Sequence, residues 1–462
     1  MLHKKSLITN NRLSFLFFFI IVIIIWDMFL DENLAIIAIG IASVFIGILL
    51  TFLIHIHKIK EYRNSVYLFI LFYLIYLSYT SLVHYGLLNF YDVSNIVPDE
   101  HYFYKTSNEA YVKIQEGYSF LEMSEMRMYK DTIGVVYFNG LVATLANIYG
   151  ENSILIQKMS VVFVASLIPM VMYGISRLYF SEKVSINVAL VYGIFSFLPY
   201  HSGILLRDVH IALMFILTIY IVLQKRSILN FILLFFIVVE SYYLRPQTGI
   251  FMIGFVSIYL FLFIRKLTLN RYLEFFIYFI FLALIIFLIV NSSLFEMFTQ
   301  IEESSAKRGV ATTSSGSLGA VISKLPFGLN ILAQFGFSQI QPFPPAWIFK
   351  GSNRGFFELW YLIAAISWFF GWGFLLYGLK VKKIFSKLDL KIKLMFFLSV
   401  IYLVLITIIE FNQRRQMAVY PILYLLMVFS YIEMSVSERT KVWISMGILY
   451  IILVLLINYI KL

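Results

Sequence analysis

The stretch LSFLFFFIIVIIIWDMFL at residues 13–30 decides the fold class, because it carries a single charge over the length of a membrane-spanning helix. Roughly 20 apolar residues in a helix cross the hydrocarbon core of a bilayer. The stretch is long, lacks a small-residue cleavage site and holds Asp27 near its end, so we expect a membrane helix and no cleavable signal peptide.

Stretches of the same kind recur along the 462 residues, of which 61% are hydrophobic and 13% charged. This composition excludes a soluble domain and predicts an all-α, polytopic membrane protein with about thirteen transmembrane helices. We expect them near 13–30, 34–56, 65–88, 155–179, 184–201, 208–224, 228–244, 247–264, 272–291, 356–379, 394–411, 416–434 and 442–460.

Charge sets the orientation of these helices. With the N-terminus inside, more than half of the 36 Lys and Arg residues fall on the cytoplasmic side, as the positive-inside rule requires. The net charge of +11 then reflects orientation, and no nucleic-acid partner is expected. The abundance of Phe, Ile, Tyr and Lys is typical of an AT-rich bacterial genome, so we expect a bacterial cytoplasmic (inner) membrane. The chain has no cysteine, which excludes disulfides and thiol chemistry.

Two polar segments divide the chain. Both are expected on the outer side of the membrane. The first has helical patterns at 103–116 and 133–149, which predict surface helices. The second is rich in Ser, Gly and Thr before Pro342–Pro345. The second is either a flexible lid over an outer cavity or a disordered connector. The predicted segments are N-terminal transmembrane helices (1–88), the first extracytoplasmic segment (89–153), a central transmembrane bundle (154–291), the second extracytoplasmic loop (292–355) and C-terminal transmembrane helices (356–462).

Four arginines stand where the positive-inside rule predicts few cations, in very short outer loops. They are Arg207, Arg245, Arg414 and Arg415. The planar guanidinium fork suits a phosphate or pyrophosphate better than an ammonium does. The pattern therefore predicts an anion-binding site on the outer face.

Three further polar residues belong to this candidate substrate site. Asp208 either caps the next helix and neutralises Arg207, or aims Arg207 at a ligand. His101 and His210 can bind substrate or a metal, although a histidine at a membrane boundary is more often only hydrogen-bonded.

An acidic pair, Asp99 and Glu100, follows the third apolar stretch. Two carboxylates at a membrane boundary are costly unless they are solvated, paired or metal-bound. Either is a candidate general base, because a low-dielectric cavity mouth favours proton uptake. An ordinary solvated turn is the alternative interpretation.

The order of these features resembles the GT-C superfamily of polyprenyl-phosphate-dependent membrane glycosyltransferases. Asp99-Glu100 resembles the family's acidic pair, and the run from Tyr137-Phe138-Asn139-Gly140 to Tyr173–Phe180 looks like the stretch that follows its first loop. Leu205-Leu206-Arg207-Asp208 and Leu244-Arg245-Pro246 are similar to segments of capsule and O-antigen members. One departure is that the acidic pair follows the third apolar stretch, whereas in the family it usually follows the first.

The resemblance implies a repeat-unit polymerase or related transferase that uses a lipid-linked sugar or oligosaccharide and contacts membrane lipids. Asp99 or Glu100 would deprotonate the acceptor, and the arginines would stabilise the departing phosphate. A divalent cation is possible; no metal ligands are assigned. The competing interpretation is a lipid-linked oligosaccharide flippase or other secondary transporter, for which deep central charges and short loops are expected.

Overall fold

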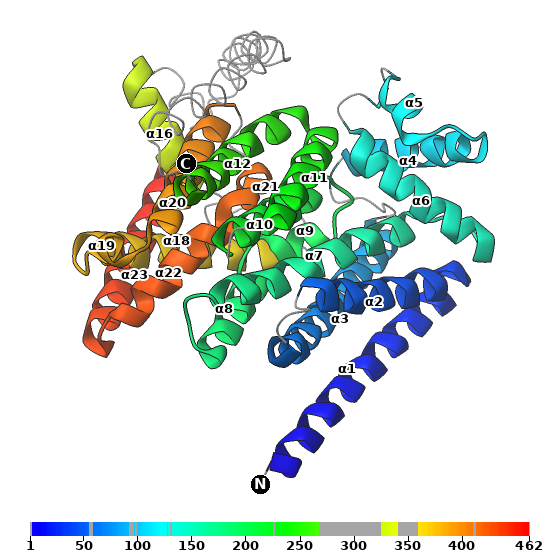
Figure 1. Cartoon of the computed structure of the whole chain (residues 1–462), viewed down its shortest axis with the longest axis horizontal. Helices are drawn as coiled ribbons and strands as arrows, with labels where there is room; N and C mark the ends of the chain where they lie inside the picture. The colour runs from blue at the N-terminus through cyan, green and yellow to red at the C-terminus, as the bar shows by residue number, and fades with distance from the viewer. Residues whose placement is uncertain are drawn as a thin grey trace. The chain divides into compact units, whose positions relative to one another are not determined.

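The computed structural model describes residues 2–54, 59–91, 97, 99–126, 128–129, 132–224, 227–267, 325–340, 359–409 and 413–461. Within these ranges all regular secondary structure is helical (Figure 1). The chain forms two compact units, Met1–Ile216 with Trp347–Ala364, and Leu217–Ala346 with Ala365–Leu462. The predicted all-α fold class is therefore confirmed for the described residues.

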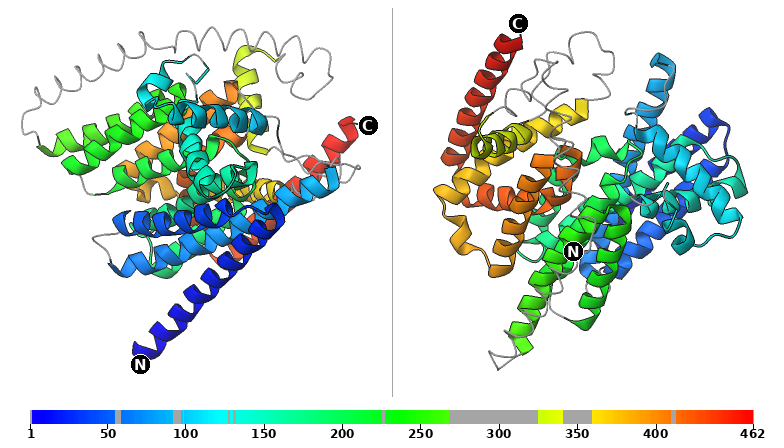
Figure 2. Two further views of the ribbon diagram at one scale, coloured as in Figure 1. Left: turned by 90° about the vertical axis from the view of Figure 1, so that its right-hand side faces the viewer. Right: turned by 90° about the horizontal axis from the view of Figure 1, so that it is seen from above.

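The first unit is built around α7, whose side chains are almost all buried. Helix α3 packs along α7, α2 packs against both of them, and α1 packs against α2 and α3. Helices α4 and α6 lie side by side, and α6 packs against α2 and α7 (Figures 1 and 2). The helices are α1 (Leu2–Asp31), α2 (Ala35–Ile54), α3 (Ile59–Tyr91), α4 (Asp99–Gln115), α5 (Phe120–Ser124), α6 (Ile133–Tyr149), α7 (Ile154–Ser176), α8 (Glu182–Phe195) and α9 (Leu198–Ser202).

The second unit contains a helical hairpin, α11 (Ile228–Leu244) and α12 (Pro246–Leu267). Helix α20 packs against α12, α16 and α22. The boundary between the units falls inside α10 (Asp208–Leu223) and inside α18 (Leu359–Lys380). The remaining elements are α16 (Phe327–Ile340), α19 (Ile384–Lys387), α20 (Leu390–Ile409), α21 (Gln413–Gln416), the 3-10 helix η2 (Met417–Val419), α22 (Tyr420–Glu433) and α23 (Val436–Lys461).

Eight helices among the described residues are long and apolar enough to cross a membrane, which is the make-up of a multi-pass membrane protein. Each coincides with one of the expected helices. They cover Leu13–Asp31, Ala35–Ile54, Glu61–Asn89, Ile154–Ser176, Leu359–Lys380, Leu390–Thr407, Arg414–Glu433 and Val436–Leu456. Helices α6, α10 and α11, and the stretch Pro246–Leu262 of α12, are apolar but shorter. The total of thirteen stays a prediction, since the expected helix at 272–291 lies outside the described residues.

The expected single helix at 184–201 is wrong, because the structure breaks it into α8 and α9. Ser196 ends α8 in an extended conformation, with φ −88° and ψ 177°. Its hydroxyl accepts a hydrogen bond from the backbone N–H of Leu198, 3.2 Å away. Pro199, in the first turn of α9, has no N–H to continue the earlier ladder. The break turns α9 into a short corner before α10.

The two polar segments contain three helices of at least 14 residues in their described parts. Helices α4 and α6 confirm the helical patterns at 103–116 and 133–149. Helix α16, inside the segment 292–355, was not predicted. The Ser- and Gly-rich stretch and Pro342–Pro345 lie outside the described residues.

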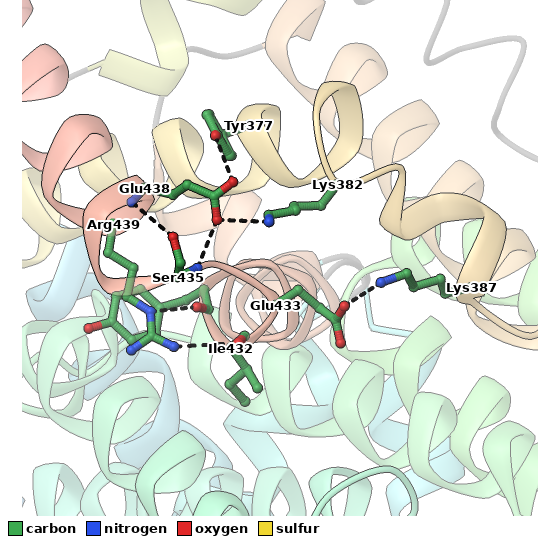
Figure 3. A network of polar contacts seen from close by, with 9 residues as sticks. Tyr377, Lys382, Lys387, Ile432, Glu433, Ser435, Glu438 and Arg439 are labelled. Atoms are coloured by element: carbon green, nitrogen blue, oxygen red, sulfur yellow. Dashed lines mark hydrogen bonds and ion pairs between the residues drawn. The ribbon is translucent and has the colours of Figure 1, made fainter.

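One end of the second unit is held by charged contacts between helix ends (Figure 3). Glu438 accepts from the ammonium of Lys382 at 2.7 Å and from the hydroxyl of Tyr377 at 3.1 Å. Lys387 pairs with Glu433. These contacts join the end of α18 and α19 to the end of α22 and the first turn of α23.

Candidate functional site

The acidic pair opens helix α4, and its two carboxylates have different surroundings. Asp99 is exposed, whereas the side chain of Glu100 is 0% exposed. Successive helix residues point about 100° apart, so one member can face the surface while the next faces the core. The sequence gives no reason to distinguish the two carboxylates, whereas the structure exposes one and buries the other.

Glu100 binds groups from three separate parts of the first unit. Its Oε1 lies 3.1 Å from Nζ of Lys158, whose side chain is also 0% exposed. The same oxygen accepts the backbone N–H of Leu205 at 2.9 Å, and Oε2 accepts that of Val97 at 3.2 Å. A buried carboxylate is tolerated when it is paired and hydrogen-bonded in this way. Glu100 therefore joins the start of α4 to α7 and to the loop after α9.

That loop, residues 203–207, leads directly to the first of the four arginines. Gly203 packs closely on Tyr79, because an added Cβ would lie 3.1 Å from Cε1 of that ring. The carbonyl of Arg207 accepts the first backbone hydrogen bond of α10, from Ile211 at 3.1 Å. Arg207 is half-buried, and Asp208 is the buried first residue of α10. The structure thus brings the acidic pair and the Arg207 loop together across 105 residues of sequence.

The two candidate histidines lie in different environments, and a third histidine, His201, lies on the α9 corner. His101 is exposed on α4. His210 is buried in α10, and its ring meets Phe138 of α6 edge to face, with centroids 5.5 Å apart. His201, on α9, packs near Tyr361. Among the described residues there is no group of three or more His, Asp or Glu side chains that could hold a metal ion.

Aromatic residues that the sequence did not single out support the α9 corner. Tyr361 packs against Tyr200 with ring centroids 4.7 Å apart. The indole N–H of Trp360 donates to the carbonyl of Ile194 at 2.6 Å, and its ring meets Tyr79 at 5.4 Å. These contacts hold the corner that carries the Arg207 loop.

A buried polar cluster between α4, α6 and α7 was also missed. Asn108 accepts from the side-chain amides of Asn152, at 2.6 Å, and Gln157, at 3.4 Å. Ser160 lies 2.9 Å from Oδ1 of Asn139. Gln157 and Ser160 flank Lys158 on α7, so polar groups gather around the buried ion pair. The signal was available in the sequence as polar residues in the first turns of an apolar helix.

Arg245 belongs to the second unit, at the corner between α11 and α12. It ends α11 in an extended conformation, and its carbonyl accepts the N–H of Thr248 at 2.9 Å, which starts α12. Pro246 follows, where a helix must break. The residue is only 6% exposed, so its guanidinium lies inside the unit rather than at a solvated loop tip.

Arg414 and Arg415 are half-buried on the short helix α21. Their neighbour Gln416 is buried, and its Oε1 accepts the side-chain amide of Gln339 from α16 at 2.9 Å. Gln339 in turn accepts the indole N–H of Trp368 at 3.2 Å. The sequence did not reveal this network, which fixes the corner carrying the two arginines. Arg207 lies in the first unit and the other three arginines in the second, so their convergence stays a prediction.

Comparisons with known proteins give no relative for this chain. No protein-family model, no curated protein and no solved structure matches it.

Proposed function

We propose that the chain is a membrane glycosyltransferase that acts on a lipid-linked sugar or oligosaccharide at the extracytoplasmic face of a bacterial inner membrane. Its carrier would be undecaprenyl phosphate or pyrophosphate. Within this class a repeat-unit polymerase of surface polysaccharide synthesis is favoured, because two lipid-linked glycans would need anion-binding groups at more than one corner. The resemblance to the GT-C superfamily supports the same class.

One observation carries the proposal: the hydrogen bond between Glu100 and the backbone N–H of Leu205. It joins the turn that bears Asp99 to the loop that bears Arg207. A glycosyl transfer from a phosphate carrier needs a proton acceptor and a phosphate-binding cation within one site. The first unit supplies both groups from segments far apart in the sequence.

In the proposed reaction the acceptor hydroxyl attacks the anomeric carbon of the donor sugar. The new carbon–oxygen bond forms as the bond to the carrier phosphate breaks, and Asp99, the exposed carboxylate, takes the hydroxyl proton. Arg207 binds the departing phosphate, on which negative charge grows in the transition state. Arg245, Arg414 and Arg415 stay predicted phosphate-binding residues of the second unit.

The test uses purified protein in detergent micelles and the lipid-linked repeat unit that accumulates in a strain lacking the gene. We expect the parent protein to join repeat units, with release of the carrier phosphate. Asp99→Asn should lower turnover by about 100-fold or more, because an amide cannot accept the proton. Glu125→Gln, at an exposed carboxylate of the same outer segment, is the matched control and should keep parental turnover.

The same assay separates an enzyme from a transporter. A flippase moves its substrate between two sides of a membrane and forms no glycosidic bond. In micelles it therefore leaves the length of the glycan unchanged. Absence of any glycan product from the parent protein, together with loss of lipid-linked units from the outer leaflet in the deletion strain, would contradict the proposal and favour the transporter.

A further inference from the structure

Three segments of the first unit meet at one buried carboxylate. We define the Glu100 clamp as the side chains of Glu100 and Lys158 with the backbone N–H of Leu205. The ion pair spans 3.1 Å, and the hydrogen bond to Leu205 spans 2.9 Å. Lys158 lies in the second turn of α7, the most buried helix of the unit, so one end of the clamp is anchored in the core.

Stability alone does not explain an ion pair at this position. Moving two charges out of water costs about as much as their attraction returns, and well-packed apolar residues of similar volume often stabilise a protein equally. What an apolar pair cannot supply is a directional bond to the N–H of Leu205. That bond fixes where the loop after α9 lies relative to the first turn of α4.

The clamp also keeps Glu100 out of reach of a substrate at the surface. Its side chain has no exposed surface, and each of its two oxygens accepts a hydrogen bond or faces an ammonium. Asp99, the preceding residue, is exposed. The neighbours of the clamp, not the clamp itself, are therefore placed to meet a substrate.

We propose that Lys158 and Glu100 are positioning residues, which set the distance between the proton acceptor Asp99 and the phosphate-binding Arg207. This inference rests on the proposed function. Arg207 stands two residues after Leu205, and Asp99 one residue before Glu100, so a shift at the clamp passes directly to both. In enzymes a misplacement of about 1 Å can cost about 100-fold in rate.

Two double variants test the proposal, because both remove the two charges together. Glu100→Gln with Lys158→Met keeps an amide oxygen for the N–H of Leu205 and loses only the acceptor for the N–H of Val97. Glu100→Met with Lys158→Met has similar volume but offers no acceptor. With the isolated repeat unit as substrate, we expect the first to keep kcat within about threefold of the parent. The second should lose about tenfold or more in kcat, with the KM for the repeat unit little changed.

The pH profile separates positioning from catalysis. A general base produces the acidic limb of the kcat profile, and this limb disappears when the base is removed. We expect the limb to persist in the Glu100→Gln, Lys158→Met variant and to vanish in Asp99→Asn. Loss of the limb and of turnover in that double variant would show that Glu100 is itself the base. Parental kcat in the folded Glu100→Met, Lys158→Met variant would show that the contact positions nothing.

Thermal unfolding keeps the clamp testable if the proposed function fails. Lys158→Met alone leaves a buried carboxylate without its cation, and we expect its unfolding midpoint to fall by about 5 °C or more. The added Glu100→Gln change should recover most of that loss, because no buried charge remains. A midpoint that does not recover would overturn the clamp. A recovered midpoint in a protein that never joins repeat units would overturn the function alone.

Discussion

At the residue scale, all four candidate arginines are at least partly buried. Arg207 and the pair Arg414–Arg415 are half-buried, and Arg245 is buried between two helices. Guanidinium groups bind phosphate through two parallel N–H donors, an arrangement that a lysine ammonium cannot reproduce. An arginine used only as an interfacial anchor needs no such fork.

This difference gives a prediction for Arg207. Arg207→Lys keeps the charge and most of the length but loses the fork, so turnover of the lipid-linked repeat unit should fall by about tenfold or more. Arg439→Lys is the matched control. Arg439 is half-buried in the second unit and donates to the carbonyl of Tyr431 at 2.9 Å. We expect its variant to work normally. Parental turnover in both variants, measured with the same repeat unit, would make Arg207 an anchor.

The sequence pattern reveals some residues of the candidate site and hides others. The pattern brought out Asp99, Glu100 and Arg207, because charges next to apolar stretches stand out. Lys158 lies inside an apolar stretch, where hydropathy averages over about 19 residues hide one ammonium. Its partner lies 58 positions away in a different helix, and only the packing of α4 against neighbouring helices brings the two together.

At the element scale, the α11–α12 hairpin places Arg245 by close backbone approach. A Cβ added to Gly249 would lie 2.5 Å from Cα of Tyr242, which is a backbone atom that cannot rotate away. Gly254, on the same helix, meets only side-chain atoms of Leu398 at 3.6 Å, an ordinary contact. Glycine is therefore required at the first position and dispensable at the second.

We predict opposite outcomes for the two alanine variants. Gly249→Ala should destabilise the protein by about 1–3 kcal/mol, the usual range for overpacking, and should also lower turnover by moving Arg245. Gly254→Ala should be neutral or slightly stabilising, because alanine favours a helix over glycine by about 1 kcal/mol. Thermal unfolding of both variants checks this. Equal midpoints would mean that α11 and α12 do not need the close approach.

Element boundaries could be predicted where the hydrophobic pattern was regular. The pattern at 133–149 coincides with α6, whereas the expected helix at 184–201 is broken near Ser196 and Pro199. Helix α16 was hidden by the Ser- and Gly-rich composition of its segment. Pro326, just before its first residue, and Pro342, two residues beyond Ile340, were the available signals for its two ends.

At the scale of the whole molecule, loops that charge assigns to one side of the membrane contact each other within each unit. In the first unit, Glu61 before the third expected helix pairs with Arg177 at 3.5 Å. At the other end of that unit, the side-chain amide of Asn33 donates to the carbonyl of Glu151 at 2.6 Å. In the second unit, the ammonium of Lys391 donates to the carbonyl of Leu223 at 3.0 Å. Each contact joins loops that the positive-inside rule places on the same side.

A labelling experiment tests this orientation, because the chain has no cysteine and any introduced thiol is unique. Glu125→Cys lies in the first outer segment, and Ser386→Cys lies in α19, in a loop expected inside; both positions are exposed. In intact cells a membrane-impermeant maleimide should label Glu125→Cys at once and Ser386→Cys only after permeabilisation. Both proteins should retain parental turnover, which shows that labelling reports the native fold. The reverse pattern would place Asp99 and Arg207 in the cytoplasm, where the proposed outer-leaflet donor does not reach them.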